Sequence, residues 1–280
     1  MIEPVLSDDA FVGDVESARP DARTLHVWWL GQSGYLVKWN SGRLLIDPYL
    51  SDSLTEKYAG SDRPHVRLSR RVVDPARLGK ISVITATHQH TDHLDERTLR
   101  AIREADLKAD EPWLPMLVAP RAIREIAEQR WGGDVNVLLN DNETYGWGDF
   151  SIRAVAAAHD RLERNGRGWS HYLGYVFRFG SICIYHSGDT VVYDGMVEQL
   201  RPMGIDVAIL PINGKLHNMN GAEAAKLGKA IGAKRVVPCH YDMFEFNTAD
   251  PREKFIPECE RIGQAYHILR LGERLTLQNG

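Results

Sequence analysis

The sequence is poor in cysteine and has no long apolar run. Its three cysteines are an odd and scattered set, which argues against a disulfide framework and predicts a reducing, cytoplasmic location. No uninterrupted apolar stretch approaches the roughly 18–20 residues that a bilayer span needs, so no membrane segment is expected. The first residues carry early acidic side chains and no apolar core, so a secretory signal peptide is not expected either.

The chain also lacks an excess of positive charge. Its 34 Lys and Arg against 38 Asp and Glu give a formal net charge of −4, so no basic field is available to attract nucleic acid. Hydrophobic residues make up 43% and charged residues 26% of the 280 positions, which is typical of a soluble globular protein. This composition excludes intrinsic disorder.

Linkers and internal repeats are missing as well. No Pro/Gly/Ser-rich tract, long charge run or short-period repeat divides the chain. We therefore predict one domain over residues 1–280, with residues 1–23 as an N-terminal extension. An arginine-rich stretch at 63–71 is a candidate subunit contact, and a homo-oligomer is expected.

The apolar pattern predicts many short strands and four helices. Residues 25–47 combine β-branched and aromatic residues with two turns, which is typical of a three-stranded meander. Residues 51–80 are expected to be irregular. Further strands are expected at 81–87, 116–120, 135–139, 150–158, 172–179, 181–187, 207–212 and 235–240, with a pair near 266–277. Helices are expected at about 96–105, 121–130, 221–231 and 250–264.

The order of these elements indicates the fold class. Strand-rich stretches followed by strand–helix alternation occur twice, which favours an α/β protein with two packed sheets and helices outside them. Two helix starts carry capping signals. Asp95 is a candidate N-cap, and Asn220 with Glu223 three residues later resembles a capping box.

The strongest chemical signal is the pattern H-x-H-x-D-H, formed by His88, His90, Asp92 and His93. It directly follows a strand expected to be buried, at the sheet edge where α/β proteins present ligand-binding loops. In an extended segment His88 and His90 point to the same side and can hold one cation. Asp92 and His93, on the following turn, can face a second cation, since imidazole and carboxylate suit divalent transition metals.

Three more candidate ligands lie at the ends of apolar strands. These are His159, Asp189 and His240. Taken alone, each of them is more often a turn cap than a metal ligand. Together with the H-x-H-x-D-H run, their common placement favours a metal site.

These motifs resemble the metal-binding set of the metallo-β-lactamase superfamily, over residues 25–277. The resemblance implies a four-layer αββα sandwich with the site between the two sheets at one edge. It also implies a two-metal site: His88, His90 and His159 for the first ion, Asp92, His93 and His240 for the second, and Asp189 between them.

A finer resemblance is to the branch of L-ascorbate-6-phosphate lactonases (UlaG-like proteins). It rests on 27–31 (VWWLG), 47–49 (DPY), 185–190 (YHSGDT) and 238–244 (PCHYDMF). Those enzymes open a sugar-acid lactone and are associated with manganese. The resemblance implies two divalent ions, manganese or zinc, with iron as a third candidate.

A dinuclear site of this kind predicts hydrolysis. A divalent cation lowers the pKa of bound water to about 7 and polarises a carbonyl or phosphoryl oxygen. Asp92 is the candidate proton carrier, because it combines metal contact with proximity to the nucleophile. The alternative is that Asp92 is a ligand without a proton role.

Supporting and substrate-binding residues are also predicted. Asp47 and His186 are candidates for orienting the ligand imidazoles, although a turn cap and a packed strand residue are the alternatives. Loop side chains after the ligand strands are candidates for binding an anionic group, and solvated surface charges are the alternative. These candidates are Arg164, Arg167, Lys215 and Asn218.

We therefore predict a metal-dependent hydrolase that acts on a lactone or related small anionic ester. A phosphodiesterase for a lipid or nucleotide diester is the alternative within hydrolysis, because the same site could serve it. A di-iron oxidoreductase and a non-catalytic scaffold are the alternatives outside it. A true β-lactamase is disfavoured, since no secretion signal is seen and Asp189 stands where zinc β-lactamases commonly have cysteine.

Overall fold

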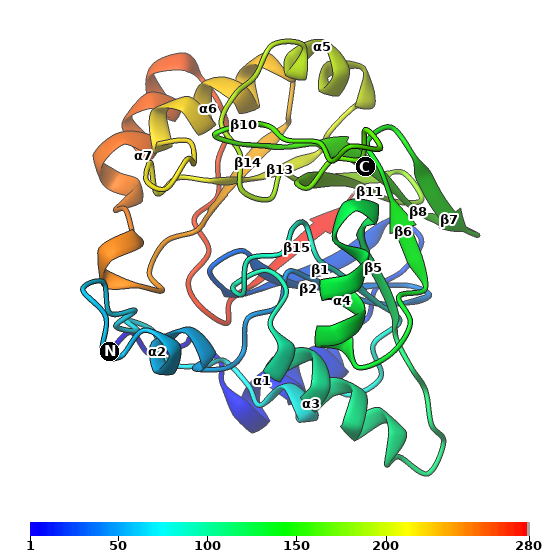
Figure 1. The fold of residues 1–280 in the computed structure, drawn as a ribbon. Coiled ribbons are helices and arrows are strands. Elements are labelled where there is room, and N and C mark those ends of the chain that lie inside the picture. The colour runs from blue at the N-terminus through cyan, green and yellow to red at the C-terminus, as the bar shows by residue number, and fades with distance from the viewer. Residues whose placement is uncertain (279–280) are drawn as a thin grey trace.

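Two β-sheets packed face to face form the centre of the molecule (Figure 1). The computed structural model describes residues 1–278, and seven α-helices lie within this range. In Figure 1, α5, α6 and α7 cover one sheet, whereas α1 and α3 lie on the far side of the other. The expected four-layer αββα sandwich is thereby confirmed. None of the helices in the described residues is long and apolar enough to cross a membrane.

The first sheet contains the predicted meander. Its strands run in the order β15-β1-β2-β3-β4-β5-β6, antiparallel as far as β3 and parallel from β3 to β6. The strands are β1 (Thr24–Gly31), β2 (Gly34–Trp39), β3 (Gly42–Ile46), β4 (Val83–Thr85), β5 (Met116–Pro120), β6 (Val137–Leu139) and β15 (Arg274–Gln278).

The second sheet runs in the order β14-β13-β12-β11-β8-β7. Its first three strands are parallel and the others antiparallel. A separate two-stranded ribbon, β9 with β10, follows β8. The strands are β7 (Thr144–Trp147), β8 (Phe150–Ala156), β9 (Ala158–His159), β10 (Arg161–Leu162), β11 (Leu173–Phe179), β12 (Ile182–His186), β13 (Val207–Pro211) and β14 (Arg235–Cys239).

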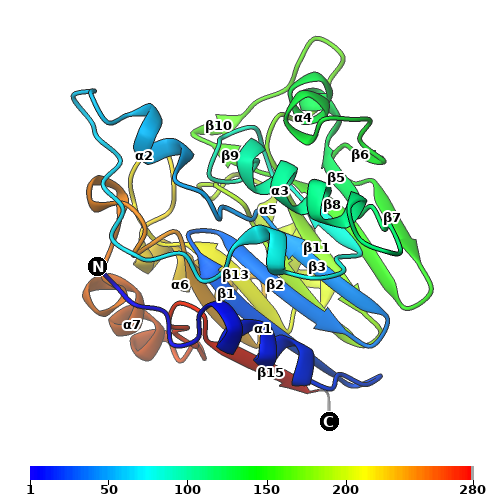
Figure 2. The same ribbon diagram turned by 90° about the horizontal axis from the view of Figure 1, so that it is seen from below.

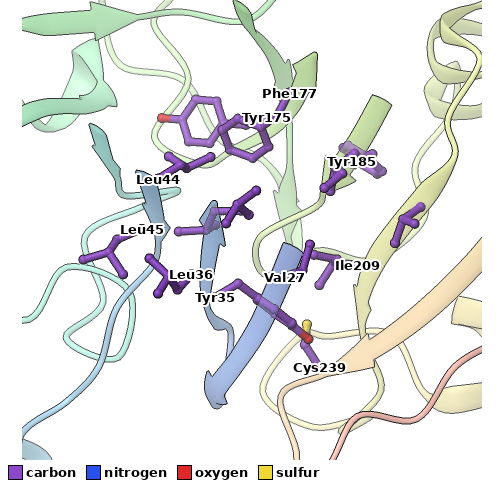
Figure 3. Close-up of a cluster of buried hydrophobic side chains, with 14 of the residues drawn as sticks. Val27, Tyr35, Leu36, Leu44, Leu45, Tyr175, Phe177, Tyr185, Ile209 and Cys239 are labelled. Atoms are coloured by element: carbon purple, nitrogen blue, oxygen red, sulfur yellow. The ribbon is translucent and has the colours of Figure 1, made fainter. Parts of the chain in front are cut away.

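Apolar side chains from both sheets fill the space between them. Figure 3 shows part of this core, including Val27, Leu44, Tyr175 and Ile209. Trp39 of β2 stacks on Phe150 of β8, with ring centroids 4.9 Å apart and planes 20° from parallel. Such burial supplies most of the folding free energy, and it fixes the two sheets relative to each other.

The two helix starts for which the sequence predicts a cap, those of α3 and α6, are capped by side chains. The Asp95 side chain accepts a hydrogen bond from Thr98 N, and Asn220 and Glu223 form the predicted capping box. The helices are α1 (Asp8–Ser17), α2 (Ser53–Lys57), α3 (Glu96–Leu107), α4 (Arg124–Trp131), α5 (Met196–Leu200), α6 (Gly221–Ala230) and α7 (Pro251–Ile262).

The N-terminal extension contributes to the core. Residues 8–17 form α1, which lies in front of the first sheet in Figure 2. Phe11 and Val15 are buried, and the Trp28 indole donates a hydrogen bond of 2.8 Å to Asp14. This helix was not predicted, because its two buried side chains give only a weak apolar stripe.

The C-terminal region also differs from the prediction, which expected two strands near 266–277. The structure has one strand there, β15. Residues 265–267 pair with β14 through only two hydrogen bonds, Val236 N to Ala265 O and His267 N to Val236 O, which is too few to form a strand. Residues 51–80 are irregular apart from α2 and one 3₁₀ turn, Pro75–Arg77.

Asp106 is expected to destabilise the fold at high pH. Burial raises the pKa of its carboxyl to about 6, it lies in the last turn of α3, and its Oδ2 has no hydrogen-bond partner among the described residues. The folded state therefore holds this proton more tightly than the unfolded chain, and the advantage is lost as pH rises through about 6.

Asp106→Asn should accordingly raise the free energy of unfolding by on the order of 1 kcal/mol at pH 8 and change it little at pH 4. Urea denaturation at the two pH values measures this difference. Asp110→Asn, at an exposed position four residues later, is the matched control. An equal effect of Asp106→Asn at both pH values would contradict the prediction.

Candidate metal centre

The predicted metal ligands follow strands that end at one edge of the sandwich. The loop 88–93 begins shortly after β4, at the carboxyl end of this parallel strand. His159 ends β9, Asp189 follows β12, and His240 follows β14. The positions of β12 and β14 in the parallel part of the second sheet explain why their loops meet at the same edge.

The seven predicted ligands converge on one centre. Asp189 lies between the histidines: its Oδ1 is 3.3 Å from His93 Nε2, and its Oδ2 is 3.3 Å from His240 Nε2 and 3.8 Å from His159 Nε2. Asp92 Oδ2 is 3.6 Å from the Nε2 atoms of both His93 and His240. Residues separated by as many as 150 positions in the sequence are thus brought within reach of one or two cations.

Three overlapping groups have ligand atoms close enough to share an ion. Each group contains three ligand atoms that lie within 4.8 Å of one another. The groups are His88, His93 and Asp189; His90, His159 and Asp189; and Asp92, His93 and His240. The third is the set predicted for the second ion. The set predicted for the first ion is divided between the other two groups, although His88 Nε2 and His90 Nδ1 are only 2.9 Å apart.

The donor set fits a divalent cation. His93 Nε2 and Asp189 Oδ1 are both buried, face each other, and have no hydrogen-bond partner within residues 1–278. The other ring nitrogen of His93 lies 2.7 Å from Asp47 Oδ2, so with a cation bound this nitrogen would keep its proton and Nε2 would present its lone pair. A cation between these two atoms would satisfy both of them.

The electrostatics of the centre divide its histidines into two classes. Burial, reinforced by the neighbouring His93, holds the pKa of His88 well below its ordinary value, and burial also lowers the pKa of His90 and His159. These rings are therefore neutral and able to coordinate metal at pH 7. Burial lowers the pKa of His93 too, but the carboxylates of Asp189 and Asp92 outweigh it and raise that pKa well above its ordinary value.

The two carboxylates are held ionised. Burial alone would raise the pKa of Asp189, but His240 and His93 outweigh it and place that pKa well below the usual range. The same opposition, with His93 and His240 prevailing over burial, lowers the pKa of Asp92. Both groups are consequently negative at neutral pH, as ligands of a cation must be.

Asp47 orients the loop that carries the H-x-H-x-D-H pattern. It follows β3 with φ of 42°, is completely buried, and accepts hydrogen bonds from the backbone N–H and the hydroxyl of Thr87 as well as its bond to His93. These contacts place Asp47 behind the imidazole of His93, where a carboxylate can orient the ring.

Asp47→Asn is expected to weaken metal binding by roughly 10- to 100-fold, because the amide loses the charge that supports His93. Competition with a chromophoric chelator measures the affinity. Asp62→Asn, on the exposed part of the 51–80 segment, serves as the control. Unchanged affinity in the Asp47 variant would show that His93 needs no support from this carboxylate.

The hydrogen bonds of His186 within residues 1–278 join it to backbone groups beside the centre. Its Nε2 lies 3.0 Å from Ser33 O, and its Nδ1 accepts from Gly188 N at 3.2 Å. Gly188 has φ of 61°, and a Cβ there would lie 2.8 Å from Thr87 Cβ. His186 therefore supports the tight turn that presents Asp189, and it does not contact a predicted ligand directly.

Two residues at the centre were missed by sequence reasoning. The amide of Gln32 donates a 2.8 Å hydrogen bond to Asp92 Oδ2, and the Tyr172 ring stacks on His159 with centroids 5.1 Å apart. Gln32 lies in the turn between β1 and β2, with φ of 51°. The sequence marks this position only as a turn residue, and it gives no signal that the turn reaches Asp92.

A cavity of about 440 Å³ opens over the centre. Five predicted ligands line it: His90, Asp92, His159, Asp189 and His240. His88 and His93 lie behind them and are buried. A substrate in the cavity would therefore meet the ligands on one side, as a hydrolytic site requires.

The four predicted substrate residues do not line this cavity. The Arg164 guanidinium makes a paired contact with the Asp141 carboxylate, at 2.7 and 2.9 Å. Arg167 borders a neighbouring cavity beside Trp169, and Lys215 Nζ donates to Phe246 O at 2.9 Å. Asn218 is buried, and its side-chain amide has no hydrogen-bond partner within residues 1–278.

Known proteins are similar to this chain over most of its length. A UPF0173 metal-dependent hydrolase of Caldivirga maquilingensis is 28% identical over 251 residues, covering 89% of this chain and 96% of that protein. Another, from Thermus thermophilus, is 28% identical over 255 residues, covering 90% and 99%.

Solved structures share the fold. Igni18, a metallo hydrolase of Ignicoccus hospitalis, superimposes with a TM-score of 0.68 at 22% identity, covering 92% of this chain and all of that one. An isothiocyanate hydrolase from Delia radicum gut bacteria gives 0.70 at 18% identity, covering 90% and 99%. The family model "Beta-lactamase superfamily domain" matches residues 26–240. The chain therefore belongs to the β-lactamase superfamily, in its metallo-hydrolase fold, and UPF0173 metal-dependent hydrolases are among its relatives.

Proposed function

We propose that this chain is a metal-dependent hydrolase that opens a lactone or a related small ester. The observation that carries the proposal is the convergence of five histidines and two aspartates beside a cavity, with His93 Nε2 and Asp189 Oδ1 unpartnered among the described residues. The names of the UPF0173 relatives support the same reaction class.

Two divalent cations, manganese or zinc, are the proposed cofactors. Asp189 belongs to the first two ligand groups and His93 to the first and third, so the groups are linked in a way that would suit two neighbouring ions. When bound, such ions supply Lewis-acid polarisation of the carbonyl and make water acidic enough to ionise near pH 7. The histidine nitrogens and carboxylate oxygens of this set suit either metal.

Asp92 is the proposed proton acceptor. Its carboxylate lines the cavity, where its side chain is 16% exposed, whereas the side chain of Asp189 is only 5% exposed. The hydrogen bond from Gln32 Nε2 to Asp92 Oδ2 fixes the orientation of the carboxylate. Because its pKa is lowered, Asp92 is ionised at neutral pH and can take a proton from the attacking water and return it to the leaving oxygen.

The test is metal analysis followed by a substrate panel. Protein purified without added metal is analysed for bound ions, treated with chelator, and assayed on a series of lactones and esters and on bis(p-nitrophenyl)phosphate. We expect lactone or ester hydrolysis that is lost on chelation and restored by manganese or zinc. Full activity in metal-free protein would refute the proposal, and hydrolysis of the phosphodiester alone would favour the phosphodiesterase alternative.

A further inference from the structure

One side of the cavity over the metal centre is a continuous set of rings. Tyr58, His65, Phe244 and Phe246, here called the aromatic wall, all line it. The Tyr58 and His65 rings stack with centroids 4.2 Å apart and planes 16° from parallel. The His65 ring also meets Phe246 at 4.5 Å and Phe244 at 5.1 Å, both edge to face.

The backbone holds this wall in place from two distant segments. Residues 66–68 pair with residues 243–245 through the hydrogen bonds Leu68 N to Met243 O, 2.8 Å, and Glu245 N to Val66 O, 3.1 Å. Tyr58 and His65 precede the first of these segments, whereas Phe244 lies in the second and Phe246 directly follows it. The wall is therefore formed before any ligand binds, which lowers the entropic cost of binding.

A leucine in strained backbone lies at the rim of the same cavity. Leu216 is 46% exposed and has φ of 49°, and His217 beside it has φ of 65°. Two successive non-glycine residues in the left-handed region cost folding free energy, and such strain is concentrated at functional sites. Other leucines are as exposed as Leu216, but Leu216 lines the cavity, so its side chain is placed to contact a ligand there.

The positively charged side chains near the cavity either bind other groups or lie at the edge of the cavity. Arg130 directs Nη1 to two backbone carbonyls of the metal loop, Gln89 O at 2.6 Å and Leu94 O at 2.9 Å. Lys57 is exposed, with its ammonium 5.1 Å from the centroid of the Tyr58 ring. Arg164, Arg167 and Lys215 do not line the cavity. The aromatic wall, together with Leu54 and Leu216, therefore gives the cavity a large apolar surface beside the metal ligands.

We propose that the aromatic wall and Leu216 bind an uncharged, apolar substituent next to the scissile bond, so that the substrate is an alkyl- or aryl-substituted lactone or ester. This inference rests on the proposed function and specifies its substrate class. The cavity, at about 440 Å³, is within the range of sites that hold small organic ligands. The carbonyl would lie at the ligand side and the substituent against the wall.

The first test is a chain-length series. Hydrolysis of γ-lactones with side chains from methyl to hexyl is measured on the metal-loaded protein. We expect kcat/KM to rise about three- to fourfold per methylene over the first few carbons, as apolar burial predicts. A lactone with a carboxylate at the end of the same chain should be the poorer substrate. A flat series, or a preference for the carboxylate, would overturn the inference.

Two variants assign the effect to these side chains. Phe246→Ala and Leu216→Ala should each flatten the dependence of kcat/KM on the chain length of the lactone. Leu216 is exposed, so its variant is expected to fold even where truncation of a wall residue is not tolerated. Leu114→Ala, at a leucine that is also 46% exposed but does not line the cavity, is the matched control and should keep the full dependence.

A binding series separates this inference from the proposed function. The 2-alkylcyclopentanones have a ring and carbonyl like those of the lactones but no bond to hydrolyse. Their Kd, measured by calorimetry, should fall with increasing chain length in the wild-type protein. In Leu216→Ala, the Kd should depend only weakly on chain length. If no lactone or ester is hydrolysed, the proposed function fails and this binding series decides the inference alone. A Kd independent of chain length would overturn it.

Discussion

Replacement of Asp189 by alanine is expected to lower kcat/KM by at least about 1000-fold and to reduce bound metal below one ion per chain. Asp189 belongs to two of the three ligand groups, and its two oxygens face His93 and His240 at 3.3 Å. Its loss would leave buried imidazoles without their anionic partner, so both proposed ions lose a ligand at once. The effect of an electrostatic group acting directly at the reacting centre has this magnitude.

Metal content and kinetics on the best lactone or ester of the panel are measured on the same preparations. Asp194→Ala is the matched control, because Asp194 is an exposed aspartate five residues later in the same loop. This variant should keep the metal content and the kcat/KM of the wild-type protein. Circular dichroism confirms that the Asp189 variant is folded. A folded Asp189→Ala protein that keeps two ions and wild-type kcat/KM would show that the centre does not depend on this carboxylate.

The sequence predicts the metal centre better than the rest of the cavity, because short-range patterns carry most of its signal. The motif at 88–93 is contiguous, and His159, Asp189 and His240 each follow a recognisable strand. Parallel strands deliver their carboxyl ends to one edge, which explains the placement of the ligand loops after β4, β12 and β14. His159 instead lies in the antiparallel ribbon of β9 and β10. The αββα layering follows from the same alternation of strands and helices.

Residues whose role depends on long-range contact could not be predicted. Gln32 lies 60 positions from Asp92, and nothing in the β1–β2 turn indicates that contact. Arg164 was chosen for its charge, but Asp141, 23 residues before it, pairs with that charge. The aromatic wall joins segments near positions 60 and 245, and the second of these contains only a short 3₁₀ helix, Glu245–Asn247. Composition gives such residues no distinguishing feature.

The N-terminal helix shows the same limit for the fold. Phe11 and Val15 of α1 are buried, and the Phe11 ring meets the Trp28 ring edge to face at 6.4 Å. Two apolar residues in a polar segment do not predict a helix in isolation. Only the apolar surface of the first sheet, which the sequence places later in the chain, makes this helix favourable.

Asp92→Asn is expected to lower kcat about 100- to 1000-fold while both ions remain bound. The amide keeps an oxygen that can coordinate metal and accept the hydrogen bond from Gln32, but it cannot take up a proton at neutral pH. Asp92 differs in this respect from Asp47, which is completely buried. The Asp47 carboxylate hydrogen-bonds Thr87 and the Nδ1 atom of His93, the ring nitrogen that faces away from the centre. Asp47→Asn should therefore weaken metal binding and recover kcat at saturating metal, whereas Asp92→Asn should not recover it.

Metal titrations of kcat on both variants separate the two roles. If Asp92→Asn loses its ions as fully as its activity, or if excess metal restores kcat, Asp92 acts only as a ligand and the water must lose its proton to another group.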